Sequence, residues 1–205
     1  MKPAVKPAVK RAALGGLIGP AGFVGAWAAG GAIKRGYSPV NDAISRLAAI
    51  GASTRPLMSG GFVCFGLAVP VYGLALKQAL PGRAWMTAVA TGAATLGVAA
   101  FPLGVSSTGD VVHGCWATAG YVTLAATPLL AAKPLAAAGQ RWAARASVAT
   151  GVASGLCLAA TVFGPAHGFW QRAGLTIGDV WLAASAAAML SRGRGAPPKA
   201  AATTQ

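Results

Sequence analysis

The sequence predicts an all-α integral membrane protein: a bundle of about six transmembrane helices, with a short extracytoplasmic amphipathic helix after the first. Hydrophobic residues make up 55% of the chain and charged residues only 10%, whereas a soluble domain carries about 25% charged residues. The apolar residues gather in runs close to the roughly 20 residues that cross a bilayer. The basic residues fall at the ends of those runs, as is typical of membrane topology signals.

Six apolar runs define the predicted helices. They are separated by short polar or basic connections, and they cover Ala12–Ile33, Leu57–Leu76, Ala84–Leu103, Val111–Ala132, Ala146–Gly164 and Ala173–Leu190. Three regions follow from this pattern: a basic N-terminus at 1–11, a transmembrane domain at 12–192 and a disordered tail at 193–205. The tail is rich in Pro, Ala and Thr and cannot bury enough apolar surface to fold.

The basic residues also predict the orientation. Twelve of the 17 lie in the N-terminus, the second and fourth connections and the tail, whereas five lie in the other connections. Because basic loops stay in the cytoplasm, both termini are expected there, in a multi-pass protein of the cell (plasma) membrane. The net charge of +14 is thus explained by topology and contact with membrane lipids, and nucleic acid is not an expected partner.

The connection from Lys34 to Pro56 is too polar to span a membrane. Ser38–Asp42 has the chemistry of a helix start, and apolar residues then recur at helical spacing: Ile44, Leu47, Ala48 and Ile50. The pattern predicts an amphipathic helix over Asn41–Ile50 that lies on the outer membrane surface.

All the acids and histidines lie on or near the outer side of the predicted bundle. Asp42 and Arg46 are four residues apart, and Asp110 and His113 three apart, so each pair is expected to share a helix face. Asp179 lies seven residues beyond Arg172, about 10 Å deeper in the last helix. Because a buried carboxylate is costly in a membrane, Asp179 is expected to face the bundle interior with a partner: Arg172, His113, Arg46 or Asn41.

Each of these residues also has a purely structural interpretation. Asp42 and Asp110 can cap helices, His113 and His167 can be interfacial histidines with satisfied hydrogen bonds, and Arg172 can anchor at headgroups. Asp179 can form a structural ion pair. No catalytic motif, metal-type spacing or cofactor motif is present, so no metal and no cofactor are expected.

The chain also resembles the DUF998 membrane proteins, a group named as a domain of unknown function. The resemblance rests on residues in the outer connections and the helix ends beside them: Tyr37–Leu47, Thr54–Met58, Gly61-Phe62, Phe101-Pro102, Asp110–Gly114 and Gly168–Arg172. It implies a bundle of about six helices, in agreement with the apolar runs, and it implies no assigned activity.

Three functions are compatible with this pattern. The first is binding or transport, in which an outward-facing polar pocket holds a lipid headgroup or small polar molecule; its candidate residues are Asn41, Asp42, Ser45, Arg46, Asp110, His113, His167, Gln171, Arg172 and Asp179. The second is an intramembrane hydrolase or transferase for envelope lipids, with His113 as general base, Asp110 or Asp179 orienting it and Ser45 as nucleophile. A long Ser45–His113 separation with no shared cavity would exclude this version.

The third is a scaffold for other membrane proteins. In that case the small-residue faces Gly15/Gly16 and Gly92/Ala93/Gly97 would pack against partner helices. The sequence predicts no oligomeric state.

Overall fold

The computed structural model describes residues 6–191, and the elements in this range are all helical. They are α1 (Pro7–Ala13), α2 (Gly15–Ile33), the 3-10 turn η1 (Ile44–Leu47), α3 (Arg55–Ala79), α4 (Ala84–Ala100), α5 (Ser107–Ala137), α6 (Arg141–Phe163) and α7 (His167–Ser191). The six predicted runs each coincide with one of the long helices, so the predicted all-α bundle is confirmed. The predicted disordered tail at 193–205 lies outside the described residues.

Five segments are long and apolar enough to cross a membrane by length and composition: Pro7–Ile33, in which α1 and α2 are joined, and α3, α5, α6 and α7. The sixth helix, α4, has 17 residues and extends about 26 Å at 1.5 Å per residue. It is apolar and packs between α3 and α5. The chain is therefore a multi-pass integral membrane protein.

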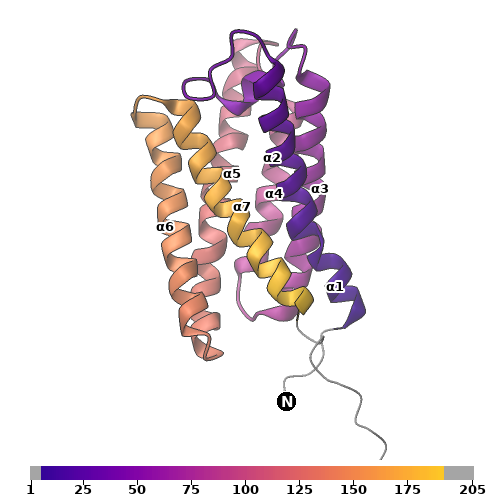
Figure 1. Ribbon diagram of the computed structural model, residues 1–205, viewed down its shortest axis with the longest axis vertical. Coiled ribbons are helices and arrows are strands. Elements are labelled where there is room, and N and C mark those ends of the chain that lie inside the picture. Colours follow the sequence, from indigo (N-terminus) through magenta and orange to yellow (C-terminus); the bar gives the residue numbers. More distant parts are fainter. Residues whose placement is uncertain (1–5, 192–205) are drawn as a thin grey trace, which may run out of the picture.

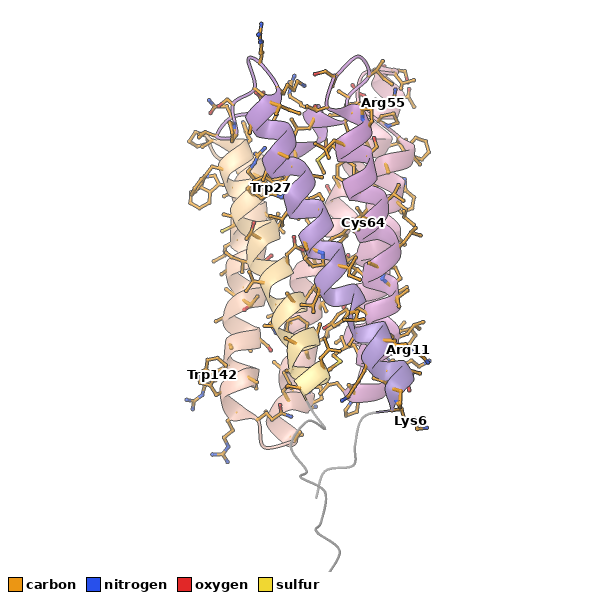
Figure 2. The ribbon with its side chains drawn as sticks, turned by 45° about the vertical axis from the view of Figure 1, so that its right-hand side comes forward. Lys6, Arg11, Trp27, Arg55, Cys64 and Trp142 are labelled. Carbon is orange, nitrogen blue, oxygen red and sulfur yellow. The ribbon has the colours of Figure 1, made fainter. Side chains whose placement is uncertain are left out.

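From α2 onwards, consecutive long helices are antiparallel neighbours, and α7 closes the bundle by crossing obliquely over it (Figure 1). It starts beside α6 and ends near α1. We call one end of the bundle the loop end, formed by the connections 34–54, 101–106 and 164–166. The other is the basic end, formed by α1 and the connections 80–83 and 138–140. Figure 2 labels Arg55 and Trp27 towards the loop end and Lys6, Arg11 and Trp142 towards the basic end.

Small residues allow close helix contacts inside the chain. A Cβ on Gly16 would meet the Tyr72 ring of α3 and Ala186 of α7, and one on Gly92 would meet the Pro70 ring. A Cβ on Gly97 would overlap the Trp116 indole. The small-residue faces proposed for partner helices are thus occupied by the chain's own helices, because a missing side chain lets a large neighbour pack against the backbone.

The predicted surface helix at Asn41–Ile50 is wrong in extent, since only the single turn η1 forms. Ile44 and Leu47 are fully buried, as the apolar spacing predicted, but they pack onto the bundle end and the segment does not continue as a helix. Helical continuation is unnecessary here because Gln171 and Arg172 of α7, together with Thr54, hydrogen-bond backbone groups of the connection. Gly51, at φ +79°, then turns the chain towards α3.

Candidate functional site

Arg172 of α7 holds the long connection onto the loop end. Its Nη1 donates to the carbonyls of Pro39 (2.8 Å), Asp42 (3.1 Å) and Gly168 (2.8 Å), and its Nη2 donates to the Tyr37 hydroxyl. The side chain is 9% exposed. Pro39 and Asp42 lie in the connection outside any helix, so the guanidinium supplies donors to carbonyls that have no helical partner.

Aromatic rings surround the same guanidinium. Its carbon lies 5.4 Å from the Trp27 ring centre and 5.5 Å from that of Tyr37, within cation–π range. Burial raises the pKa of the Tyr37 phenol above its ordinary 10.0, and the charge of Arg172 opposes this shift. Both Nη atoms are thus bonded to the protein and two rings lie within cation–π range, whereas Nε has no hydrogen-bond partner among the described residues.

Gln171 is buried beside Arg172 and joins three elements. Its Oε1 accepts from the backbone N–H of Ile44 at 2.8 Å, and its Nε2 donates to the Tyr121 hydroxyl of α5. The Gln171 amide thus provides hydrogen-bond partners for the Ile44 N–H at the start of η1 and for the Tyr121 hydroxyl in an apolar helix. A buried phenol normally needs such a partner.

Ser45 and His113 form a hydrogen-bonded pair below the connection. Ser45 Oγ lies 2.8 Å from His113 Nε2, and His113 Nδ1 lies 2.7 Å from the carbonyl oxygen of Phe101. Both side chains are buried, at 7% and 5% exposure. The separation that would have excluded the enzyme hypothesis is therefore absent.

The Phe101 carbonyl fixes the tautomer of His113. Phe101 caps α4, and Pro102, which follows it, has no N–H with which to continue the helix. A carbonyl only accepts hydrogen bonds, so Nδ1 carries the proton. In the neutral ring Nε2 is then an acceptor, and the Ser45 hydroxyl donates to it. Neither Asp110 nor Asp179 orients His113, contrary to the enzyme hypothesis; a backbone carbonyl does.

A cavity of about 50 Å³ lies inside the loop-end half of the bundle. It has room for a few water molecules or for a small group of a larger ligand. Its lining is aromatic and aliphatic with a few neutral polar groups and no charged side chain: Phe23, Ile44, Ser45, Phe62, Phe65, Thr91, Thr95, Val98, Trp116, Ala117, Gly120, Tyr121, Leu124, Gln171 and Leu175. The polar groups Ser45, Tyr121 and Gln171 come from η1, α5 and α7.

Trp116 is a cavity-lining side chain that also reaches the surface of the bundle. Trp116 lines the cavity and is also 39% exposed. Its indole lies against Gly97 of α4, where any larger residue would displace it. Trp116 therefore contributes both to the lining of the cavity and to the exposed surface of the bundle.

Asp179 is buried as predicted but unpaired. It is 2% exposed, and neither carboxyl oxygen has a hydrogen-bond partner among the described residues. The predicted direct contact with Arg172, His113, Arg46 or Asn41 is wrong, because Arg172 and His113 are bound to the loop-end backbone and Arg46 and Asn41 are exposed. Asp179 lies one turn deeper than Leu175 on the same helix face, and Leu175 lines the cavity.

The remaining candidate residues lie outside the cavity. Arg46 is exposed and pairs with Asp42 at 3.7 Å, and Asp42 accepts from the Ser38 N–H at 2.8 Å. Asp110 is exposed and accepts from the Gly104 N–H at 2.8 Å, while Ser106 caps α5. His167 Nδ1 bonds the Thr161 carbonyl at 2.7 Å on the exposed surface. Their bonds are local, and Asn41 is exposed in the turn before η1.

Sequence reasoning did not find the aromatic half of this arrangement. Tyr37, Tyr121 and Trp27 bind or flank the buried polar groups, and Phe23, Phe62 and Phe65 line the cavity with Trp116. A hydroxyl in the middle of an apolar run, as at Tyr121, was an available signal, since a phenol in a membrane helix needs a partner.

The described residues contain no group of three or more His, Cys, Asp or Glu side chains that could hold a metal ion. A second cavity, of about 290 Å³, lies in the basic-end half between α3, α5, α6 and α7. Its lining is mostly apolar and includes Leu76, Leu135, Trp142, Trp181 and Met189.

Residues 17–188 match the family described as "Protein of unknown function (DUF998)", which is the family that the outer-loop residues resemble. The match covers most of the chain, and the chain belongs to this family. No curated protein and no solved structure matches it.

Proposed function

We propose that this DUF998 protein binds an ester-bearing membrane lipid at the loop end, with the ester region of the lipid in the cavity between Ser45, Tyr121 and Gln171. The observation that carries the proposal is the lining itself. It combines a hydroxyl, a phenol and an amide with aromatic walls and contains no charged side chain, which suits a neutral polar group attached to an apolar chain.

The volume limits what enters. About 50 Å³ accommodates an ester and its first carbons, so the remainder of the lipid lies outside the bundle. Trp116 lines the cavity and reaches the surface, and the acyl chain is proposed to leave past its indole, between α4 and α5. Arg46, which follows Ser45 and is exposed, is the cation available for a headgroup phosphate.

The binding hypothesis from the sequence includes Arg172 and Asp179 among the ligand-binding residues. Arg172 instead holds the connection in place, and its loss would disturb the site only indirectly. The proposal therefore rests on neutral groups within the cavity.

The test is to fill the cavity and measure bound lipid. Ala117→Phe places a ring in the cavity, whereas Ala159→Phe adds the same ring at an exposed position on α6. Native mass spectrometry and lipidomics on the purified protein should find an enriched ester lipid in the wild type and in Ala159→Phe. Ala117→Phe should lose most of it. Equal lipid content in all three, or none in the wild type, would refute the proposal.

The orientation with both termini in the cytoplasm is part of this proposal. It places the loop end, and with it the lipid site, in the outer leaflet of the cell membrane, and the charge asymmetry between the two ends supports it.

A further inference from the structure

We infer that Ser45 is a nucleophile and His113 its general base, so that the loop-end site cleaves or transfers the acyl group of the ester lipid it binds. This inference rests on the proposed function, because the bound lipid ester is its substrate. The juxtaposition that carries it is a buried serine, hydrogen-bonded to an imidazole of fixed tautomer, on the wall of an apolar cavity.

Three geometric requirements for such a pair are met. Ser45 Oγ and His113 Nε2 are 2.8 Å apart, within the range for proton transfer. The Phe101 carbonyl, 2.7 Å from Nδ1, holds the ring with Nε2 free to accept a proton, which is the role of the third member of a catalytic triad. Ser45 also lines the cavity, so an ester in the cavity can reach Oγ.

The position in the fold also favours chemistry on a lipid. Ser45 lies in η1, whose backbone is fixed by Gln171, and His113 lies in the second turn of α5. Both therefore belong to the loop end of the bundle, where the ester groups of a lipid lie near the membrane surface. A purely structural serine–histidine bond would fix η1 equally well, but it would not require the serine to line a cavity.

The reaction proceeds in two balanced steps. Ser45 Oγ attacks the ester carbonyl carbon while His113 Nε2 accepts the hydroxyl proton; the C–O bond to the alcohol breaks, and the alcohol leaves with that proton. Water or a second alcohol then attacks the acyl-serine, with its proton passing through Nε2 to Ser45 Oγ as the acyl group departs. The net result is hydrolysis, or transfer of the acyl group to the acceptor alcohol.

A long-chain alkyl fluorophosphonate tests the inference directly, because it phosphonylates activated serines and loses fluoride. Intact-mass and peptide mass spectrometry of the full chain in detergent should find one adduct, on Ser45. Ser45→Ala should show none. The matched control is Ser154→Ala, which removes a buried serine bonded to the Gly174 carbonyl; it should be labelled like the wild type.

Two variants separate chemistry from folding. His113→Ala should slow labelling at least about 100-fold, the usual contribution of a general base. Ser45→Cys should be alkylated by iodoacetamide, which shows that position 45 is reachable in a folded protein. An unlabelled wild type, an adduct on another residue, or a Ser45→Cys variant that resists alkylation would overturn the inference.

The outcome is distinguishable from failure of the proposed function. If the wild type binds the ester lipid but no fluorophosphonate adduct forms on Ser45, the catalytic inference fails and lipid binding stands. If an adduct forms on Ser45 but no lipid is enriched and Ala117→Phe changes nothing, the nucleophile stands and the lipid site fails.

Discussion

The two ends of the bundle close their connections by different means. At the basic end, the amides of Ala138, Gly139 and Gln140 in the connection at 138–140 donate to backbone carbonyls of the last turn of α5. At the loop end, buried side chains from α7 bind the backbone of a 21-residue connection, and His113 of α5 bonds the Ser45 hydroxyl within it. A short turn can bond its amides to the helix that precedes it, whereas a long connection close to a membrane must obtain hydrogen-bond donors and acceptors from other helices.

This contrast explains why the polar residues gather at one end. Arg172, Gln171 and His113 each bind a loop backbone group or a side chain of η1, and each also contacts an aromatic ring, a phenol or a serine. The same network that fixes the connection therefore forms the polar boundary of the cavity. At the basic end the larger cavity is mostly apolar.

The sharpest test of the comparison is topological, because its outcome is all or none. In a background in which Cys64, Cys115 and Cys157 are replaced by Ala, Ser53→Cys at the loop end should react with an impermeant maleimide added to intact cells. Ala138→Cys at the basic end should react only after the cells are opened. The reverse pattern would place the loop end in the cytoplasm and contradict the proposed outer-leaflet site.

The next largest effect is expected at Arg172. Arg172→Leu removes the donors of several buried carbonyls, so the free energy of unfolding should fall by about 3 kcal/mol. The apparent Tm in detergent should then fall by roughly 6–12 °C. Arg55→Leu is the control: it removes an exposed arginine at the same end and should change the free energy by less than about 1 kcal/mol. If Arg172→Leu and Arg55→Leu lowered Tm equally, the loss of positive charge, and not the loss of the loop contacts, would explain the destabilisation.

The smallest expected effect is at Asp179, although it is the most deeply buried acid. Its oxygens have no partner among the described residues, so Asp179→Leu removes an uncompensated polar group and should leave Tm unchanged or raise it by a few degrees. A clear fall in Tm would reveal a partner and restore the structural ion-pair interpretation. The amount of lipid bound by Asp179→Asn distinguishes a functional role of Asp179 from a structural one. If this variant loses the lipid but keeps the wild-type Tm, the lipid site extends one helical turn deeper than the cavity.

The sequence predicted the helices well and the site only in part. Each apolar run became a helix, because a segment in hydrocarbon has to satisfy its own backbone groups. The helix predicted at Asn41–Ile50 is reduced to the turn η1 because its cap and spacing signals are local. Arg172 and Gln171 bind the backbone of this connection from a distant helix, and His113 binds the Ser45 side chain. Ser45 and His113, 68 residues apart, were proposed together from residue type alone. Their acidic partner was wrong because Pro102 leaves the Phe101 carbonyl free to take that role.

The sequence by itself determined that this chain crosses the membrane several times, where its helices lie and which end carries its basic residues. Hydropathy and charge are local patterns along the chain, so they predict the spans without knowledge of which residues become neighbours in the folded protein. Only the tertiary structure decided that Ser45 meets His113, that Arg172 binds the connection, and that Asp179 has no hydrogen-bond partner among the described residues. Those relations depend on how each helix is rotated and which helix faces it, and close packing through residues such as Gly16 and Gly97 fixes both.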